Sequence, residues 1–273
     1  MTRDLPTPDL SPFDAAVRQQ AAATIDTVRA AVARGNGTLA FQPIVQSERP
    51  DRVAFHEGLI RILDPSGRII PLRDFMPHTE ALELGRQIDC LSLQLGLQAL
   101  AEDPTLRLSI NLSARSITHQ DWRDTLEVGL GAADHLAERL ILEITESSAM
   151  QMPQLVRDFM SEFQGRGVSF ALDDFGAGHT SFRYLRDFCF DMIKIDGQFV
   201  RRVADNPDNR ILVQALHDIA RHFDMLTVAE SVETAEDAAM LIGMGIDCLQ
   251  GFYFGAPTIR PPWRSPAGSA GLR

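Results

Sequence analysis

Lys194 is the only lysine among the 26 basic residues of this 273-residue chain, and the other 25 are arginines. Arginine is a planar, permanently charged fork, whereas lysine is a compact point charge whose pKa shifts when it is buried. A single lysine in such a chain is therefore a candidate catalytic residue. The alternative is a lysine left by chance, and Lys194 alone does not decide between the two interpretations.

Acidic and amide residues recur where short apolar segments end. They are Glu57, Asn111, Glu143, Asp173, Asp174, Glu230 and Gln250. If these groups converge, their carboxylates repel one another unless cations neutralise them. Oxygen ligands without His or Cys favour Mg²⁺ or Mn²⁺ and argue against zinc or copper.

Each acidic residue also has a simpler explanation, because an acid at a strand end often caps the following helix. Glu146, which two serines follow, needs no other role. Asp173 and Asp174 face opposite ways on a regular strand, so both reach one site only if the strand ends there. Glu57 and Arg61 share a strand face, where Arg61 suits either a phosphate oxygen or a structural ion pair with a carboxylate.

The apolar pattern predicts eight strands with helices between most of them. The expected strands are Leu39–Val45, Val53–Ile62, Leu106–Leu112, Leu140–Thr145, Val168–Asp174, Phe190–Asp196, Leu226–Ser231 and Asp247–Phe254. The helical stretches include Arg73–Ala101, Gln154–Arg166, Asn209–His222 and Ala235–Met244. This alternation favours an α/β fold, a (β/α)₈ TIM-like barrel, in which reactive residues sit at the carboxyl ends of the strands.

Composition supports one sizeable core, since 45% of the residues are hydrophobic and no Gly/Ser or Pro-rich break divides the chain. The apolar runs are too short to span a bilayer, and no signal peptide opens the chain, so we expect a cytoplasmic protein. The three cysteines, Cys90, Cys189 and Cys248, lack the spacing of disulfides or zinc ligands. A net charge of −11 disfavours binding to DNA, RNA or an anionic membrane.

The sequence suggests three segments. Residues 1–38 contain an Ala-rich amphipathic helix over 12–34, which we expect to pack under the barrel rather than contact a partner. Residues 39–257 form the barrel. Residues 258–273 are a Pro/Gly/Ser tail that we expect to be flexible.

Eight segments, in this order, resemble the signatures of the EAL domain family. They are Phe41-Gln42-Pro43-Ile44-Val45, Glu57-Gly58-Leu59-Ile60-Arg61, Asn111-Leu112-Ser113, Glu143-Ile144-Thr145-Glu146-Ser147, Asp173-Asp174-Phe175-Gly176-Ala177-Gly178, Lys194-Ile195-Asp196, Ala229-Glu230-Ser231-Val232-Glu233 and Gln250-Gly251-Phe252-Tyr253-Phe254-Gly255. The resemblance runs from about Leu39 to Pro257. It implies hydrolysis of cyclic di-GMP to the linear dinucleotide pGpG, in a barrel whose first strand is antiparallel.

The resemblance also implies roles for individual residues. The implied ligands of one metal ion are Glu57, Asn111, Glu143, Asp173 and Glu230, and Asp173 with Asp174 would hold a second ion. In the implied catalytic set, Lys194 contacts the nucleophilic water, Glu230 acts as a metal ligand, Gln250 positions the water or the metal shell, and Glu146 anchors the loop after Asp174. Gln42 and Arg61 would hold the guanine nucleotide and its phosphate, and Glu233 resembles a supporting carboxylate. A homodimer packed near the loop after Asp174 and an unidentified regulatory protein are further expectations.

Two ions of Mg²⁺ or Mn²⁺ would serve this chemistry, whereas Ca²⁺ would bind but inhibit because its coordination is longer and looser. The chain departs from the family pattern at Gly58, where Ala is usual, at Ser231, where Gly is usual, and at Ala177 and His179. Gly58 offers no side chain to pack and is expected to loosen Glu57, and Ser231 is expected to affect the orientation of Glu230.

Two other functions fit the sequence less well. One is a catalytically silent cyclic di-GMP receptor that signals through a protein partner. It would be favoured if a ligand residue were missing, and none is. The other is a different barrel enzyme, such as a metal-dependent enolising enzyme, with carboxylates and a lysine at its strand ends.

Overall fold

The computed structural model describes residues 12–132, 135–177 and 185–264. The strands are β1 (Gly37–Gln46), β2 (Arg49–Leu63), β3 (Ile69–Ile70), β4 (Leu108–Asn111), β5 (Leu140–Thr145), β6 (Ser169–Phe175), β7 (Met192–Ile195), β8 (Leu226–Ala229) and β9 (Cys248–Gln250). The α-helices are α1 (Pro12–Ala33), α2 (Met76–Thr79), α3 (Glu83–Glu102), α4 (Gln120–Ala132), α5 (Glu146–Gln151), α6 (Pro153–Gln164), α7 (Gly197–Val200), α8 (Pro207–His222) and α9 (Ala235–Gly243). Short 3-10 helices cover Leu72–Asp74, Ala114–Thr118, Ala137–Arg139 and Pro262–Arg264.

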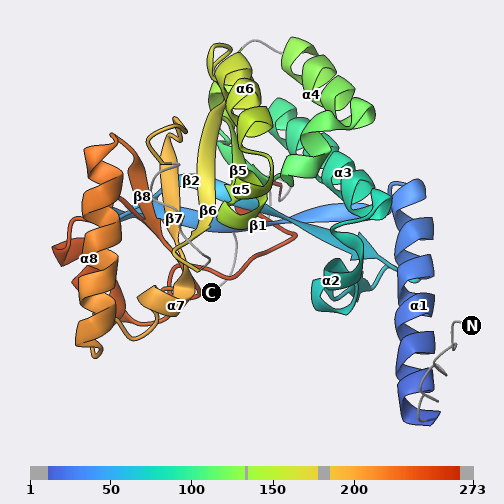
Figure 1. Cartoon of the computed structure of the whole chain (residues 1–273), viewed down its shortest axis with the longest axis horizontal. Coiled ribbons are helices and arrows are strands. Elements are labelled where there is room, and N and C mark those ends of the chain that lie inside the picture. The colour runs from blue at the N-terminus through green and yellow to red at the C-terminus, as the bar shows by residue number, and fades with distance from the viewer. Residues whose placement is uncertain (1–11, 133–134, 178–184, 265–273) are drawn as a thin grey trace, which may run out of the picture.

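The strands close into a barrel whose first strand runs against both of its neighbours (Figure 1). β1 pairs antiparallel with β2 and with β9. The other neighbours, from β2 to β4 and on to β9, pair in parallel. β3 extends the sheet from β2 outside the ring. The predicted eight-stranded barrel with an antiparallel first strand is therefore confirmed.

Side-chain alternation stacks two layers inside the barrel. The lower layer is apolar and consists of Ile44, Phe55, Ile141, Ala171, Met192, Val228 and Cys248. Two positions after six of these residues the chain has a polar residue, five of them on strands and Glu230 directly after β8. The six are Glu57, Glu143, Asp173, Lys194, Glu230 and Gln250. Because residues two apart on a strand face the same way, these six polar side chains form a second layer nearer the carboxyl ends of the parallel strands. We call it the polar layer.

Two terminal segments pack on the outside of the barrel. Val28 and Ala31 of α1 bury against a cluster that includes Ile62 and Ile88, so the helix lies beside β2 and α3 rather than under the barrel (Figure 1). At the other end, the ring centroids of Trp263 lie 4.5 Å from His56 and 5.4 Å from Phe41. Residues 258–264 of the expected tail thus pack on β1 and β2. The rest of the tail lies outside the described residues.

Most predicted strands shift by a few residues at their ends, and two predicted elements differ more. The helix predicted over Arg73–Ala101 is divided, because the chain folds back between α2 and α3 so tightly that a Cβ at Gly85 would lie 2.6 Å from the carbonyl oxygen of Glu80. The strand predicted over Asp247–Phe254 ends at Gln250. There the backbone of Gly251 packs against Val232 and begins a turn.

Gly58 is packed rather than loose. A Cβ at this position would lie 2.7 Å from Cδ1 of Ile110, so the isoleucine fills the space of the missing methyl group. The same Cδ1 also lies 2.7 Å from the Cβ position of Gly96. Ile110 therefore fits between two glycines, and the expected loosening of this strand is not evident in its packing.

We predict that Gly58→Ala alone destabilises the protein by about 1–2 kcal/mol, because the new methyl group overpacks the contact with Ile110. Adding Ile110→Val, which removes Cδ1, should recover most of that loss. The free energies of unfolding from urea titrations of both variants and of Ile110→Val alone test this. A single Gly58→Ala variant as stable as the parent chain would show that Ile110 yields without cost.

Candidate active site

Lys194 lies at the centre of the polar layer with 1% of its surface exposed. Its Nζ atom lies 2.7 Å from Glu230 Oε1, 2.8 Å from Glu143 Oε2, 3.2 Å from Asp173 Oδ1 and 3.4 Å from Glu57 Oε2. Four strands, β2, β5, β6 and β7, and the residue after β8 thus bring one ammonium group and four carboxylates together. One positive and four negative charges would leave a net charge of −3 if all were ionised.

Amide side chains complete one side of the cluster. Glu57 accepts hydrogen bonds from Asn111 Nδ2 at 2.9 Å and from Gln250 Nε2 at 2.6 Å. The same Gln250 nitrogen lies 3.2 Å from Gln42 Oε1, and Gln42 Nε2 donates to the carbonyl oxygen of Gly255. These contacts join β1, β2, β4 and β9 around Glu57.

Asp173 and Asp174 reach the same site because β6 contains a bulge. The pairing with β7 shifts by one residue between Leu172 and Phe175, and Asp174 has a φ of +55°. We expected the strand to end at this point, but it continues to Phe175 and the extra residue re-aims the second carboxylate instead. Carboxylate oxygens of Asp173, Asp174 and Glu230 lie within 4.8 Å of one another.

Other predicted residues lie around this cluster. Glu146 Oε2 accepts a hydrogen bond from the backbone N–H of Gly176, in the turn that follows Asp174. Glu233 is half exposed and lies 3.7 Å from Arg201. Ser231 has a φ of +56°, a backbone conformation that glycine adopts readily, yet Glu230 still points at Lys194. His179 lies outside the described residues.

In the residues that the structure describes, Arg61 does not form the ion pair with a barrel carboxylate that was one of its two expected roles. Its guanidinium donates to the carbonyl oxygen of Ile60, and no ion pair joins it to a carboxylate of the described part of the chain. Burial lowers its pKa, although Glu57 opposes that effect. The guanidinium is thus available to a ligand.

Burial and repulsion between the carboxylates give the acids of the cluster different pKa values. Burial, with the charges of Asp173 and Glu57, raises the pKa of Glu230 to about 8. Burial and the charge of Glu57 also raise the pKa of Glu143. Glu57 differs: burial would raise its pKa, but Lys194 and two amide hydrogen bonds hold it below its usual range. Burial would lower the pKa of Lys194, but the four surrounding carboxylates raise it.

The cluster fits a divalent cation. Oε1 of Glu143 and Oε1 of Gln250 are buried without a hydrogen-bond partner. The acidic side chains described around them offer carboxylate oxygens as metal ligands, without His or Cys. Buried acceptors normally have partners, so these atoms point to a missing positive charge. Among the described residues, Asp173, Asp174 and Glu230 bring carboxylate oxygens close enough to share an ion. The larger ligand set of Glu57, Asn111, Glu143, Asp173 and Glu230 stays a prediction from the sequence.

Two hollows border the carboxylate cluster. One, of about 290 Å³, is lined by residues that include Gln42, Glu57, Glu230 and Gln250. The other, of about 420 Å³, includes Asn111, Thr145 and Asp174 among its lining. Leu59 lines both, and acids of the cluster border each: Glu57 and Glu230 the first hollow, and Asp174 the second.

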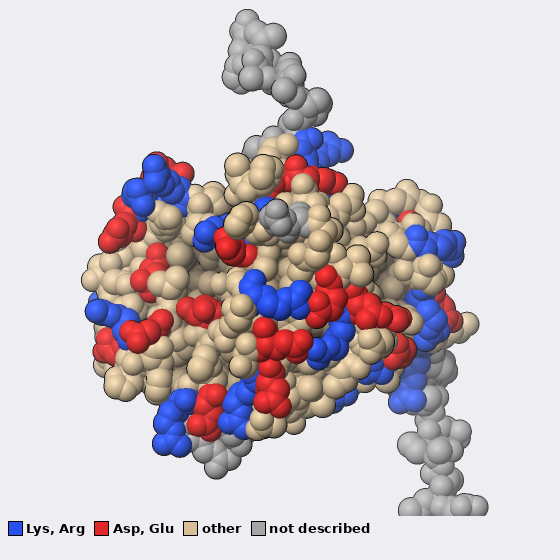
Figure 2. Space-filling view, turned by 90° about the horizontal axis from the view of Figure 1, so that it is seen from above, with Lys and Arg blue, Asp and Glu red and all other residues tan. Residues whose placement is uncertain are grey.

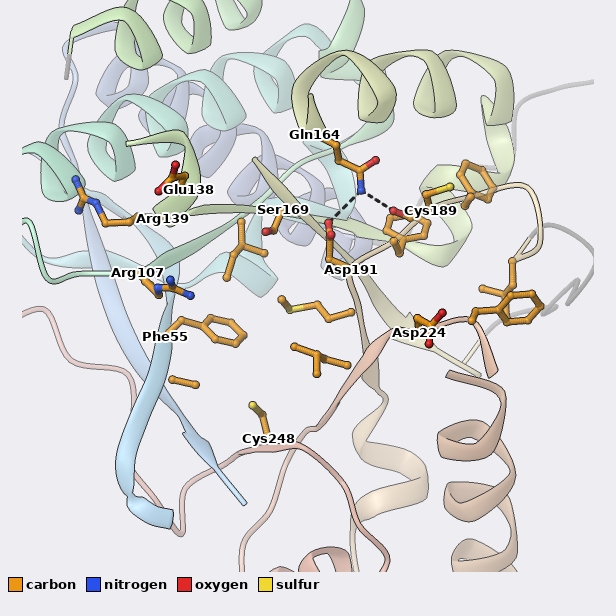
Figure 3. A pocket seen from close by; sticks show the side chains of 18 of the residues that line it. Phe55, Arg107, Glu138, Arg139, Gln164, Ser169, Cys189, Asp191, Asp224 and Cys248 are labelled. Atoms are coloured by element: carbon orange, nitrogen blue, oxygen red, sulfur yellow. Dashed lines mark hydrogen bonds between the residues drawn. The ribbon is translucent and has the colours of Figure 1, made fainter. Parts of the chain in front are cut away.

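A larger cavity of about 860 Å³ lies at the opposite end of the barrel, below the apolar layer. Figure 3 shows Phe55 and Cys248 pointing into it, and Gln164 spanning to Cys189 and Asp191 on its wall. It shares no lining residue with either hollow at the polar layer. The carboxylate cluster therefore lies away from this larger cavity.

The surface carries charges of both signs. Figure 2 shows basic and acidic side chains interspersed over one face of the molecule, without a continuous basic patch on that face. Among the described residues, none of the helices has the length and apolar character needed to cross a bilayer.

Sequence reasoning missed two residues that border the site. Arg201 and Phe252 both line the hollow beside Glu230, and Phe252 is 69% exposed. Arg201 follows α7, one short helix after the strand of Lys194, and that position is the signal that could have identified it.

Curated relatives include cyclic di-GMP phosphodiesterase PdeF of Escherichia coli, 33% identical over 74% of this chain and 28% of that protein. Cyclic di-GMP phosphodiesterase PdeB of Shewanella oneidensis is 32% identical over 80% of this chain and 26% of that protein. The chain thus spans between a quarter and a third of the length of these relatives.

Solved structures of similar fold include the PaMucR phosphodiesterase in complex with c-di-GMP, with a TM-score of 0.73 and 28% identity over 86% of this chain and 97% of that one. The FimX EAL domain from Pseudomonas aeruginosa bound to c-di-GMP gives a TM-score of 0.79 and 25% identity over 86% of this chain and 96% of that one. The family model described as "EAL domain" matches residues 25–257. The chain belongs to the EAL domain family.

Proposed function

We propose that this chain hydrolyses cyclic di-GMP to linear pGpG with the help of two Mg²⁺ or Mn²⁺ ions. The observation that carries the proposal is the convergence of four carboxylates on the ammonium group of Lys194, with Asp174 beside them. Relatives named as cyclic di-GMP phosphodiesterases and similar structures bound to c-di-GMP support the same substrate.

The reaction replaces one phosphodiester P–O bond with a bond to a water oxygen, and the departing ribose oxygen takes up a proton. Bound cations would lower the pKa of the attacking water and neutralise charge on the phosphate oxygens. Lys194 places a further positive charge in the same space, which favours the ionised form of that water. Gln250, whose Oε1 has no partner, is suited to orient it.

The shape of the site supports a substrate with two arms. A dinucleotide whose scissile phosphate lies on the carboxylate cluster would extend one nucleoside into the hollow lined by Gln42 and Gln250 and the other toward Asn111 and Asp174. Gln42 would contact a guanine, and Arg61 would contact a phosphate oxygen. Glu146 would keep the turn after Asp174 in place through Gly176.

The runner-up function is a silent receptor that binds cyclic di-GMP and signals through a protein partner. It uses the same hollows but needs neither Lys194 nor two metal ions. The homodimer, the regulatory partner and the cytoplasmic location stay predictions from the sequence, as does the exclusion of nucleic-acid polymers and membranes as partners.

We predict that the purified protein converts cyclic di-GMP to pGpG in Mg²⁺ or Mn²⁺ but not in excess chelator. Glu57→Ala or Asp173→Ala should reduce turnover by at least about 100-fold, because each removes a metal ligand. Glu236→Ala, an exposed acid on α9, is the matched control. Chromatography of the products measures the reaction. Tight binding of cyclic di-GMP without any pGpG formation would contradict hydrolysis and favour the receptor function.

Ca²⁺ should bind the site and inhibit turnover. Its oxygen ligands lie at about 2.3–2.6 Å, against about 2.0–2.1 Å for Mg²⁺, so the water and phosphate would be misplaced and less polarised. Adding Ca²⁺ to the Mg²⁺ assay should lower the rate while cyclic di-GMP binding persists in calorimetry. A full rate with Ca²⁺ as the sole divalent ion would contradict this account.

Two variants of Lys194 separate charge from geometry. Lys194→Arg keeps the charge, so it should fold and bind nucleotide, but its larger fork should remove most turnover. Lys194→Met leaves the carboxylates without their cation. In chelator this should lower the free energy of unfolding by about 3 kcal/mol. Adding Mg²⁺ should raise the free energy of unfolding of this variant by more than it raises that of the parent chain. Near-normal kcat in Lys194→Arg would refute the catalytic role.

A further inference from the structure

We propose that Arg201 is a specificity-determining residue that reads the O6 and N7 edge of a guanine base, and that Ser231 is the positioning residue that holds its guanidinium. The inference rests on the proposed function and deepens it, because it names the residue that would select guanine.

Arg201 borders the substrate hollow next to the chemistry. It lines the cavity of about 290 Å³ together with Glu57, Glu230 and Gln250, which belong to the polar layer. Its side chain is 58% exposed, so the guanidinium remains accessible to a ligand in that hollow.

The contact between Arg201 and Ser231 depends on an unusual backbone. Ser231 has a φ of +56°, and its hydroxyl accepts a hydrogen bond from Arg201 Nη2 at 3.1 Å. Non-glycine residues in this region are strained and persist where the surroundings maintain them, often at functional sites. Glycine, which the EAL pattern usually has here, would adopt the same φ without this strain but would leave Arg201 without its partner.

A neighbouring glycine makes room for that contact. A Cβ at Gly197 would lie 2.4 Å from Ser231 Oγ and 2.7 Å from its Cβ, so no larger residue fits at 197 while Ser231 keeps this position. Gly197, Ser231 and Arg201 therefore form a matched set.

The remaining partner of Arg201 holds it loosely. Glu233 Oε1 lies 3.7 Å from Arg201 Nε, and both side chains are more than half exposed. Exposed ion pairs contribute little to stability. The ion pair between Arg201 and Glu233 therefore adds little to the stability of the fold. Both side chains are free to form hydrogen bonds with a ligand instead.

The groups around the hollow match the edges of guanine. Arginine donates two parallel hydrogen bonds to O6 and N7 of guanine, and adenine instead presents an N6 amino donor beside N7. The carboxylate of Glu233 is able to accept from the N1 and N2 donors of the same base. Phe252, 69% exposed on the same hollow, offers a ring on which a base would stack.

Binding in Ca²⁺ tests the inference without turnover. We would measure by calorimetry the affinity of the parent chain, Arg201→Ala, Arg201→Lys and Ser231→Ala for cyclic di-GMP and for its 7-deaza analogue, in which CH replaces N7. Arg202→Ala is the matched control, because Arg202 is the next residue and does not line the hollow. Circular dichroism and thermal unfolding confirm that each variant folds.

We expect Arg201→Ala to weaken cyclic di-GMP binding about tenfold or more, which is the size of one bidentate contact to guanine. The 7-deaza analogue should bind the parent chain several-fold more weakly and should lose nothing further in Arg201→Ala. Arg201→Lys should resemble Arg201→Ala, because a point charge lacks the fork. In Ser231→Ala, the difference in affinity between cyclic di-GMP and the 7-deaza analogue should be smaller than in the parent chain. Arg202→Ala should bind both ligands as the parent chain does.

Three results would overturn the inference. Unchanged affinity in Arg201→Ala would show that Arg201 does not contact the ligand. Equal losses for both ligands, with recovery in Arg201→Lys, would indicate a phosphate contact instead of a base contact. A parent chain that binds neither ligand would refute the substrate and the inference together, whereas binding without pGpG formation in Mg²⁺ would refute hydrolysis alone.

Discussion

The burial of four carboxylates around a single ammonium group is the constraint on which the rest of the structure depends. One lysine cannot neutralise four acids, and burial makes each unpaired charge costly. The structure shows the result in the raised pKa values of Glu143 and Glu230 and in buried oxygen atoms without partners. Protons are one way to relieve this excess of negative charge, and divalent cations are the other. A charge arrangement that is unfavourable on its own is therefore one that cation binding would stabilise.

The barrel supplies the rigidity that such a cluster requires. Six apolar residues pack together beneath the polar layer, each two positions before one of its members. They are Phe55, Ile141, Ala171, Met192, Val228 and Cys248. The charged groups thus rest on an apolar layer, and residues of that layer such as Phe55 and Cys248 line the large cavity on its other side. The antiparallel β1 adds Gln42 to the same layer from the opposite strand direction, and Gln250 on β9 links it to Glu57.

Much of the fold and the site could be predicted from the sequence, because period-two alternation places residues such as Glu57 and Lys194 on the inner face of the barrel. Glu57 nevertheless lies within β2 and not, as the apolar pattern had suggested, at its end. The antiparallel direction of β1 came only from the family resemblance, since alternation reads the same in both directions. The bulge at Asp174 and the fold-back before α3 could not be predicted, because each depends on contacts between distant or crowded backbone segments. Arg201 was missed for a similar reason: its role depends on Ser231, 30 residues further along the chain.

Backbone strain corrects the site where regular strands would point side chains the wrong way. Asp174 and Ser231 both have positive φ values; Asp174 belongs to the carboxylate cluster, and Ser231 follows Glu230 directly. At Asp174 the bulge turns a carboxylate that would face outward into the site, next to Asp173 and Glu230. At Ser231 the same backbone conformation directly follows Glu230 and brings a hydroxyl group to Arg201. Because the barrel fixes both flanking strands, it can hold these conformations, and the orientation of the acids then depends on tertiary structure more than on local preference.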